Sequence, residues 1–205
     1  MNKIVDNVIE AIERAGLVQV EVSARHVHLN QNDLEKLFGP GAALTPKREL
    51  SQPGQFLSEE RLTVVGKRGR KENVAILGPV REHTQVELSK TDCAELGIRA
   101  PVRESGVIQD SAAVTLIGTN GSLDIDQGGI VAKTHIHMTK ALAAKLGLFD
   151  KQYATVVLLS ERPLVFCDVL IRVSDNYRNR MHIDFDEANA GGVNGFTLGQ
   201  IVPNN

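Results

Sequence analysis

Short apolar stretches separated by turn signals run through most of the 205-residue chain. Apolar and polar positions alternate in some stretches and others are continuously apolar, and both patterns are typical of strands. They predict strands at residues 18–22, 62–66, 73–77, 113–117, 129–133, 154–159 and 165–173. Turn signals lie at residues 52–55 and 119–122. Many short strands at such spacing favour β-barrels over a doubly wound sheet, so we expect a mainly β protein with short helices (α+β).

The N-terminal segment follows a different pattern. Ile4, Val8 and Ile12 recur at helical spacing with charged residues between them, and Gly16 follows. This pattern predicts an amphipathic helix within residues 1–16. Two interpretations stay open, a helix packed on the body of the protein and a detachable helix that docks into a groove of a partner.

Two predicted short strands carry His-x-His pairs, His26 with His28 and His135 with His137, which account for four of the 6 histidines. Side chains of a strand alternate between its faces, so both imidazoles of a pair point the same way. Each pair therefore presents two nitrogen donors side by side, as a metal ion requires. A lone histidine is usually an ordinary surface or core residue, but two matching pairs indicate metal.

The His-x-His pairs belong to an internal repeat of a strand end followed by a short helix. In each copy a ligand-type residue lies two positions before a residue suited to cap a helix, and a glycine follows the helical stretch. The ligand-type residues are His28, Glu87, His137 and His182, and the caps are Asn30, Ser89, Thr139 and Asp184. Without the repeat, Glu87 would be interpreted as a solvated strand carboxylate.

If the four strand ends converge, six donors gather: His26, His28, Glu87, His135, His137 and His182. Six are too many for one zinc ion, and they divide naturally into two sites of three. Three protein ligands with an open position are typical of catalytic metal, whereas structural zinc is usually closed by four. His83 has no such placement and is interpreted as an ordinary loop histidine.

Composition narrows the class of protein. The chain has 23 basic and 25 acidic residues and a formal net charge of -2, which argues against nucleic acid or an anionic membrane as the main partner. No apolar run approaches transmembrane length, and no signal peptide is recognisable. Cys93 and Cys167 cannot form a disulfide framework and fit a reducing cytosol, and we expect both in the core. Neither a Rossmann glycine motif nor a P-loop is present.

Arg81 stands six residues before Glu87, in the run Leu77-Gly78-Pro79-Val80-Arg81. A fixed guanidinium beside open metal positions is suited to bind a phosphate or a carboxylate. On spacing alone, a surface arginine is the simpler interpretation.

Taken together, these motifs resemble the PduL-type phosphotransacylases, the phosphate propanoyltransferases of bacterial microcompartments. The resemblance covers nearly the whole chain and rests on the runs 25–29, 77–87, 135–138 and 181–184, in order and spacing. It implies two small β-barrels capped by short helices, with the active site between them. Residues 17–24 and 134–205 would form the first barrel and residues 25–133 the second. Residues 1–16 would be an encapsulation helix that targets the protein to the microcompartment lumen, through contacts with the shell or core enzymes.

The resemblance also implies the reaction and the roles of the site residues. Acyl-CoA and phosphate would give acyl phosphate and CoA, reversibly. One zinc ion would be held by His26, His28 and Glu87 and would meet the CoA sulfur, and a second would be held by His135, His137 and His182. Arg81 would bind phosphate, which we expect it to hold together with the second metal ion near the thioester, and Ser105 would lie near CoA. No side-chain nucleophile is required.

Two other classes stay open at this point. A dinuclear metallohydrolase such as a thioesterase would use the same ligands and would consume acyl-CoA without phosphate. A non-enzymatic scaffold would use metals only to hold the barrels together. The sequence does not fix the preferred acyl group, because propanoyl and acetyl differ by one methylene, which is worth only about 1–3 kcal/mol of discrimination. It also does not fix whether the chain associates into a homo-oligomer.

Overall fold

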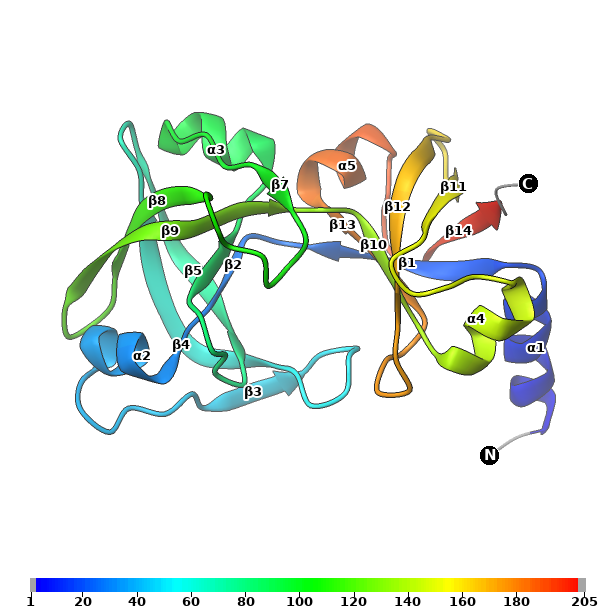
Figure 1. Cartoon of the computed structure of the whole chain (residues 1–205), viewed down its shortest axis with the longest axis horizontal. Coiled ribbons are helices and arrows are strands. Elements are labelled where there is room, and N and C mark those ends of the chain that lie inside the picture. The colour runs from blue at the N-terminus through cyan, green and yellow to red at the C-terminus, as the bar shows by residue number, and fades with distance from the viewer. Residues whose placement is uncertain (1–2, 203–205) are drawn as a thin grey trace. The chain divides into compact units, whose positions relative to one another are not determined.

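The computed structural model describes residues 3–202, and the chain divides into two compact units. Unit 1 joins the N-terminal segment up to Ser23 with the segment from Lys133 onward, and unit 2 is Ala24–Ala132. Residues 1–2 and 203–205, which belong to the predicted segments 1–16 and 134–205, lie outside the described residues. Strands dominate both units and the described helices are short (Figure 1). This confirms the predicted class, mainly β with short helices.

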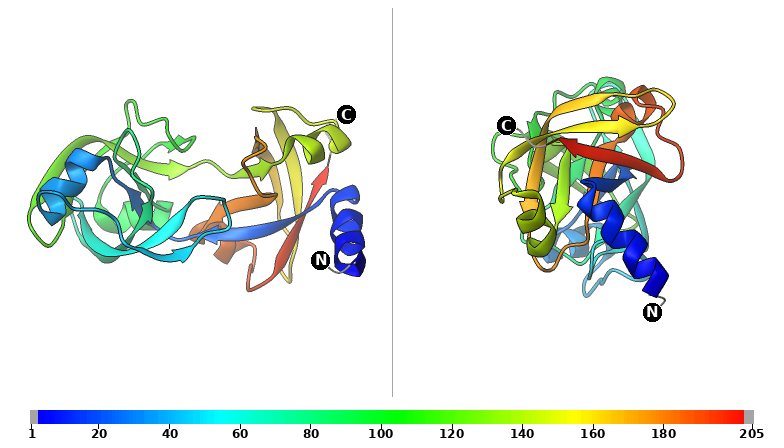
Figure 2. Two further views of the ribbon diagram at one scale, coloured as in Figure 1. Left: turned by 90° about the horizontal axis from the view of Figure 1, so that it is seen from below. Right: turned by 90° about the vertical axis from the view of Figure 1, so that its right-hand side faces the viewer.

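Unit 1 contains a closed barrel of six strands (Figure 1, Figure 2). Around the barrel they are β1 (Leu17–Ser23), β13 (Arg180–Asp184), β10 (His135–Met138), β12 (Val165–Val173), β11 (Tyr153–Leu159) and β14 (Thr197–Val202). Strand β1 is parallel to β13 and antiparallel to β14, so the N-terminal strand is built into the C-terminal barrel. The helices of this unit are α1 (Lys3–Arg14), α4 (Lys140–Leu146) and α5 (Phe185–Ala190).

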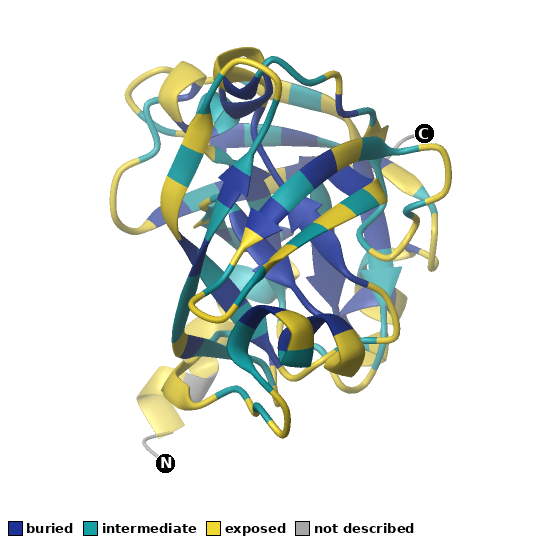
Figure 3. Cartoon of the chain, turned by 90° about the vertical axis from the view of Figure 1, so that its left-hand side faces the viewer, coloured by how far each residue is buried: buried dark blue, intermediate teal, exposed yellow. Residues whose placement is uncertain are grey.

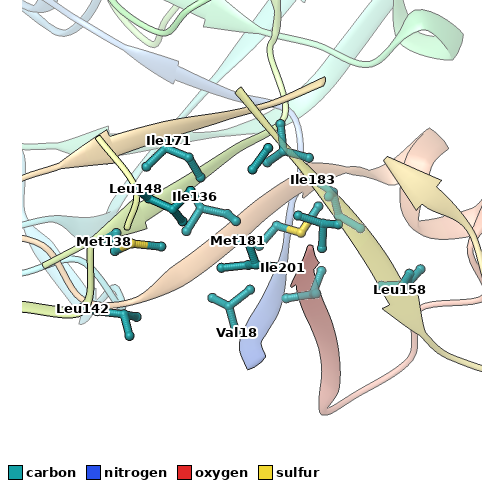
Figure 4. Close-up of a cluster of buried hydrophobic side chains, with 14 of the residues drawn as sticks. Val18, Ile136, Met138, Leu142, Leu148, Leu158, Ile171, Met181, Ile183 and Ile201 are labelled. Atoms are coloured by element: carbon teal, nitrogen blue, oxygen red, sulfur yellow. The ribbon is translucent and has the colours of Figure 1, made fainter. Parts of the chain in front are cut away.

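The core of unit 1 dictates which way its histidines point. Ile136 and Met138 of β10 are fully buried in the apolar cluster shown in Figure 4, and Met181 and Ile183 of β13 pack into the same cluster. Side chains alternate along a strand, so the histidines between these residues face away from the core. Burial of the apolar residues in the core therefore turns the imidazoles of both strands to the same, opposite side.

Unit 2 contains a second closed ring of six strands. In order they are β4 (Phe56–Val65), β5 (Arg70–Gly78), β2 (His26–His28), β6 (Gln85–Glu87), β9 (Ser122–Ala132) and β8 (Ala112–Ile117), and β8 pairs back to β4. Two further strands extend this sheet, β3 (Pro46–Glu49) on β4 and β7 (Val102–Arg103) on β9. The prediction of two small barrels with short helices is thus confirmed.

The strands of unit 2 that carry the candidate ligands are the most buried part of its barrel. Val27 and Val86 lie in the apolar core, and every residue of β2 and β6 is buried. The longer strands β5 and β9 instead contain exposed and partly exposed residues as well as buried ones, and Figure 3 shows such mixed burial along the strands. Helices α2 (Gln31–Phe38) and α3 (Lys90–Leu96) follow β2 and β6 directly.

The predicted helix caps are confirmed in all four copies of the repeat. The side chains of Asn30, Ser89, Thr139 and Asp184 each accept a hydrogen bond from the backbone N–H three residues later. Gly97 and Gly147 end two of the helices in the left-handed conformation, which glycine adopts without strain. In each copy the cap therefore stands two residues after the last candidate ligand and fixes where the helix begins.

Some of the structure departs from the sequence predictions. The core position expected for Cys167 is wrong: the residue is exposed on β12, whereas Cys93 is buried as expected. The sequence patterns also missed β3, β7 and β14. Among residues 3–202, no helix combines the length and apolar character that crossing a lipid bilayer requires.

Candidate functional site

In unit 2, three candidate ligands come together across two adjacent strands. Strands β2 and β6 are antiparallel, and their register places His26 opposite Glu87. His28 lies on the same side of β2 as His26, so the donor atoms of all three side chains lie within 4.8 Å of one another. All three residues are buried. We call His26, His28 and Glu87 the unit 2 triad.

Hydrogen bonds with backbone carbonyls fix the tautomers of the two histidines of this triad. Nδ1 of His26 donates to the carbonyl of Ala24 at 2.8 Å, and Nδ1 of His28 donates to that of Leu77 at 3.1 Å. A carbonyl can only accept, so Nδ1 carries the proton and the lone pair of each neutral ring lies on Nε2. Both Nε2 atoms face the carboxylate of Glu87, at 3.4 Å and 4.0 Å. The donors thus converge on one point.

Unit 1 repeats this arrangement with three histidines. Strands β10 and β13 are antiparallel, and His135 lies opposite His182. With His137, their donor atoms also lie within 4.8 Å of one another. Nδ1 of His135 donates to the carbonyl of Lys133 at 2.8 Å, in the manner of His26 and Ala24. We call His135, His137 and His182 the unit 1 triad.

Two further side chains support the unit 1 triad from outside. The ring of Tyr177 stacks on His137 with 4.2 Å between the ring centroids. Nδ1 of His182 faces the carboxylate of Glu21 at 4.0 Å, and Arg180 donates to that carboxylate at 3.0 Å. A carboxylate behind a histidine favours a proton on the facing nitrogen, which directs the other nitrogen toward a metal.

The buried groups of the unit 2 triad shift one another's pKa values. Burial lowers the pKa of His26, but the charge of Glu87 and a hydrogen bond with it outweigh burial and leave this pKa raised. Burial, with the charges of His26 and Arg81, holds the pKa of His28 well below its ordinary value. Burial raises the pKa of Glu87, yet the two histidines prevail and hold it well below the usual range. At neutral pH Glu87 is therefore ionised and His28 neutral, as metal ligands must be.

The donor sets of both triads fit a divalent metal ion. Two imidazoles with a carboxylate, and three imidazoles, are donor sets that bind zinc with positions left for water or substrate. Because the Nδ1 atoms of His26, His28 and His135 are engaged with carbonyls, the Nε2 atoms are the available ligands. The structure brings the six predicted side chains into two groups of three. Their binding of metal stays a prediction.

A hydrogen-bonded network joins Arg81 to the unit 2 triad. Arg81 donates to the hydroxyl of Ser105 at 3.2 Å, and this hydroxyl donates to Glu87 at 2.7 Å. The backbone N–H of Arg81 donates to the carbonyl of Leu29 at 2.8 Å, which fixes the loop to the end of β2. The structure thus places Arg81 and Ser105 beside one triad. The exposed His83, in contrast, is not part of either triad.

Sequence reasoning missed the central member of this network, Gln85. Its amide donates to Glu87 at 2.6 Å and to Ser105 at 3.0 Å, and its oxygen accepts from the backbone N–H of Gly106 at 2.7 Å. Gln85 is buried and therefore has to be hydrogen-bonded. The sequence does contain an indication of its role, because Gln85 and Glu87 occupy the same two places in β6 that the histidine pairs occupy in β2 and β10.

The metal-free protein is expected to become less stable as the pH falls below about 6.5, in part through His28. The folded-state pKa of His28 lies below the unfolded value, so the unfolded chain binds more protons in this range. The stability that neutral His28 contributes is thus complete above the unfolded pKa and is lost as the pH falls. His26 has the opposite sign, since its raised pKa adds stability that is complete below the unfolded pKa and is lost as the pH rises through the folded value.

Urea unfolding of the chelator-treated protein over a series of pH values measures this effect. The His28→Gln variant is expected to lose stability less steeply on acidification than the original chain. Parallel pH profiles for the two proteins would contradict the assignment of the effect to His28.

Comparison with known proteins agrees with the geometry. The family model for phosphate propanoyltransferase matches residues 19–194. Proteins named phosphate propanoyltransferase from Clostridioides difficile and Listeria monocytogenes are 44% and 46% identical to this chain, over 98% of the chain and 97% and 96% of their own lengths. One of that name from Thermotoga maritima is 50% identical over 89% of the chain and 88% of its own length. The chain therefore belongs to the phosphate propanoyltransferase family and is an acyltransferase.

Proposed function

We propose that the chain interconverts acyl-CoA and phosphate with acyl phosphate and CoA, taking propanoyl and acetyl groups, and holds one zinc ion or similar divalent ion in each triad. The family name supports the reaction. One observation carries the proposal: Arg81 is joined to the buried unit 2 triad through the hydroxyl of Ser105, which accepts from Arg81 and donates to Glu87. An anion-binding group and a candidate metal centre are thereby held side by side in unit 2.

The side chains of unit 2 supply binding and orientation for this reaction. An oxygen of phosphate bonds to the acyl carbonyl carbon as the carbon–sulfur bond breaks, and CoA leaves as a thiolate that is then protonated. When bound, the metal ions would supply Lewis acidity for the developing oxyanion and a partner for the sulfur. The planar guanidinium of Arg81 would hold phosphate through paired N–H groups. Ser105 keeps Arg81 in place, and it is also our candidate contact for CoA because its loop borders the same triad.

No covalent acyl-enzyme is part of this proposal. Cys93 is buried in the apolar core, and neither Cys93 nor the exposed Cys167 belongs to a triad in residues 3–202. Direct attack by phosphate needs only that the two substrates be held together, which supplies much of the rate advantage.

The test is the release of free thiol from propanoyl-CoA, followed with and without phosphate, before and after chelation. We expect release that depends on phosphate, yields acyl phosphate and stops when metal is removed. Release without phosphate would instead identify a thioesterase. No release from propanoyl-CoA or acetyl-CoA by protein that holds two metal ions would identify a scaffold.

We also propose that α1 docks on the shell or core enzymes of a bacterial microcompartment and so places the protein in its lumen. Its apolar residues lie in the exposed part of the helix (Figure 3): Ile4, Val5, Val8 and Ile9 are 69%, 48%, 51% and 50% exposed. Such a stripe on an amphipathic helix is suited to a partner groove. Removal of residues 1–16 is expected to abolish co-purification with microcompartments and to leave thiol release unchanged. Retained co-purification would contradict this role.

A further inference from the structure

The helix that follows β6 begins with the carboxylate of Asp92, which contacts the backbone of Ser89 and the side chains of Arg25 and Lys71. In α3, Oδ2 of Asp92 accepts from the backbone N–H of Ser89 at 3.3 Å, which completes a capping box. Its other oxygen, Oδ1, accepts from Nε of Arg25 at 2.8 Å and also lies 3.3 Å from Nζ of Lys71. Arg25 is the residue immediately before His26, and Asp92 is buried. One side chain therefore links the start of β2 to the end of β6.

Unit 1 contains the same arrangement, built from different residues. In α5, Oε2 of Glu187 accepts from the backbone N–H of Asp184 at 2.9 Å and completes the capping box. Its other oxygen, Oε1, accepts from the hydroxyl of Thr134. Thr134 immediately precedes His135. Burial raises the pKa of Glu187, and the hydrogen bonds from Thr134 and Asp184 oppose that shift.

The contacts of Asp92 with Arg25 and of Glu187 with Thr134 each lie next to two candidate ligands that face each other across neighbouring strands. His26 is opposite Glu87, and His135 is opposite His182. The strands concerned are short, 3 residues each for β2 and β6, and their ladders alone contribute few hydrogen bonds. A carboxylate that fixes the chain one residue before the first histidine restrains the spacing between the first and third ligands.

Helix capping alone does not explain why the capping carboxylates of Asp92 and Glu187 also contact the residue before a histidine pair. Helix α4 begins with Thr139 as its cap and has Leu142 where the carboxylate would stand. The carboxylate in the capping box recurs in α3 and α5, the two helices that follow the single-ligand strands β6 and β13. In both cases its other oxygen contacts the residue that precedes a His-x-His pair.

We propose that Asp92 and Glu187 are positioning residues, each of which preorganises the metal triad of its own unit by holding the His-x-His strand against the strand of the third ligand. The inference rests on the proposed function in one respect, namely that the triads bind metal. It assigns to these carboxylates an effect on metal affinity beyond their contribution to helix stability.

The sharpest test removes only the strand contact of unit 1. Thr134→Val deletes the hydroxyl and leaves the capping box of Asp184 and Glu187 intact, and Thr134→Ser keeps the hydroxyl as a matched control. Both are made in a His28→Ala background, in which the unit 1 triad alone is complete. The zinc Kd is measured by competition with a chelating indicator. We expect Thr134→Val to weaken binding about tenfold, at the lower end of the effect of lost outer-sphere contacts, and Thr134→Ser to bind like its background.

Asp92→Asn tests the carboxylate of unit 2 itself, with its contacts to Arg25 and Lys71, in a His137→Ala background that leaves the unit 2 triad complete. Thr134→Val in this second background is expected to leave the zinc Kd unchanged, because the affected triad is already broken. The melting temperature of each metal-free variant is recorded as well. A purely structural role would lower that temperature and leave the Kd of the folded protein as before.

The outcomes separate this inference from the proposed function. If the original chain binds two zinc ions and neither Thr134→Val nor Asp92→Asn changes a Kd, the positioning role is wrong and the proposed function stands. If Thr134→Val does not fold, Asp92→Asn and Glu187→Gln in their own single-triad backgrounds decide the question. If the original chain binds no zinc, the metal centres and the inference fall together.

Discussion

Replacement of His28 by alanine is expected to remove one metal ion per chain and to lower kcat/KM for phosphate-dependent CoA release at least about 1,000-fold. His28 is buried, and its Nε2 faces Glu87 at 4.0 Å. Alanine leaves the unit 2 triad with two donors, too few to hold zinc firmly. Lewis-acid stabilisation of a transition state is worth several kcal/mol, and about 4 kcal/mol corresponds to about a thousandfold in rate. Metal analysis of the purified protein and steady-state kinetics measure the two effects.

His83→Ala is the matched control for this prediction. His83 lies in an exposed loop, with its ring 60% exposed beside Glu82, and belongs to neither triad among the described residues. Its replacement is expected to leave metal content and rate unchanged. Equal activity of the His28→Ala and His83→Ala proteins would show that the unit 2 triad has no part in catalysis.

The candidate ligands could be found from the sequence because the signals that locate them are local. A cap such as Asn30 or Thr139 acts within three residues, and strand alternation fixes the common face of His26 and His28. Short-range rules of this kind give the end of each strand and the direction of its side chains. They do not give strand order, so the sequence could not show that His26 lies opposite Glu87.

The elements that were missed depend on long-range packing. Strand β14 contains Gly199, a residue type typical of turns, yet this glycine is buried within the strand. A Cβ there would meet Val156 at 2.8 Å, so the packing leaves room only for glycine. Strand β3 has only exposed residues and forms through its pairing with β4. The network around Gln85 likewise requires the loop at Ser105 to fold back onto β6, which no local pattern predicts.

Replacement of Arg81 is expected to impair the use of phosphate more than the use of acyl-CoA. Loss of one preorganised donor to a developing charge costs about 100–1,000-fold in rate, so Arg81→Ala should lower kcat/KM for phosphate by about that factor. Arg81→Lys keeps the charge and loses the planar fork, and we expect it to recover only part of this loss. The hydrogen bond to Ser105 holds the guanidinium beside the unit 2 triad. In the proposed reaction Arg81 binds inorganic phosphate there, so its loss should fall mainly on the use of phosphate. Initial rates with phosphate varied at saturating acyl-CoA, and the reverse, separate the two KM values.

Arg70→Ala is the control, because Arg70 is 68% exposed and pairs with Glu72 at the surface. It carries the same charge in the same unit, so it distinguishes a local contact with phosphate from general attraction of anions by unit 2. If Arg70→Ala raises the KM for phosphate as much as Arg81→Ala does, the binding role assigned to Arg81 is wrong. If Arg81→Ala alone raises it, with the metal content unchanged, the phosphate site belongs to the network that joins Arg81 to the unit 2 triad.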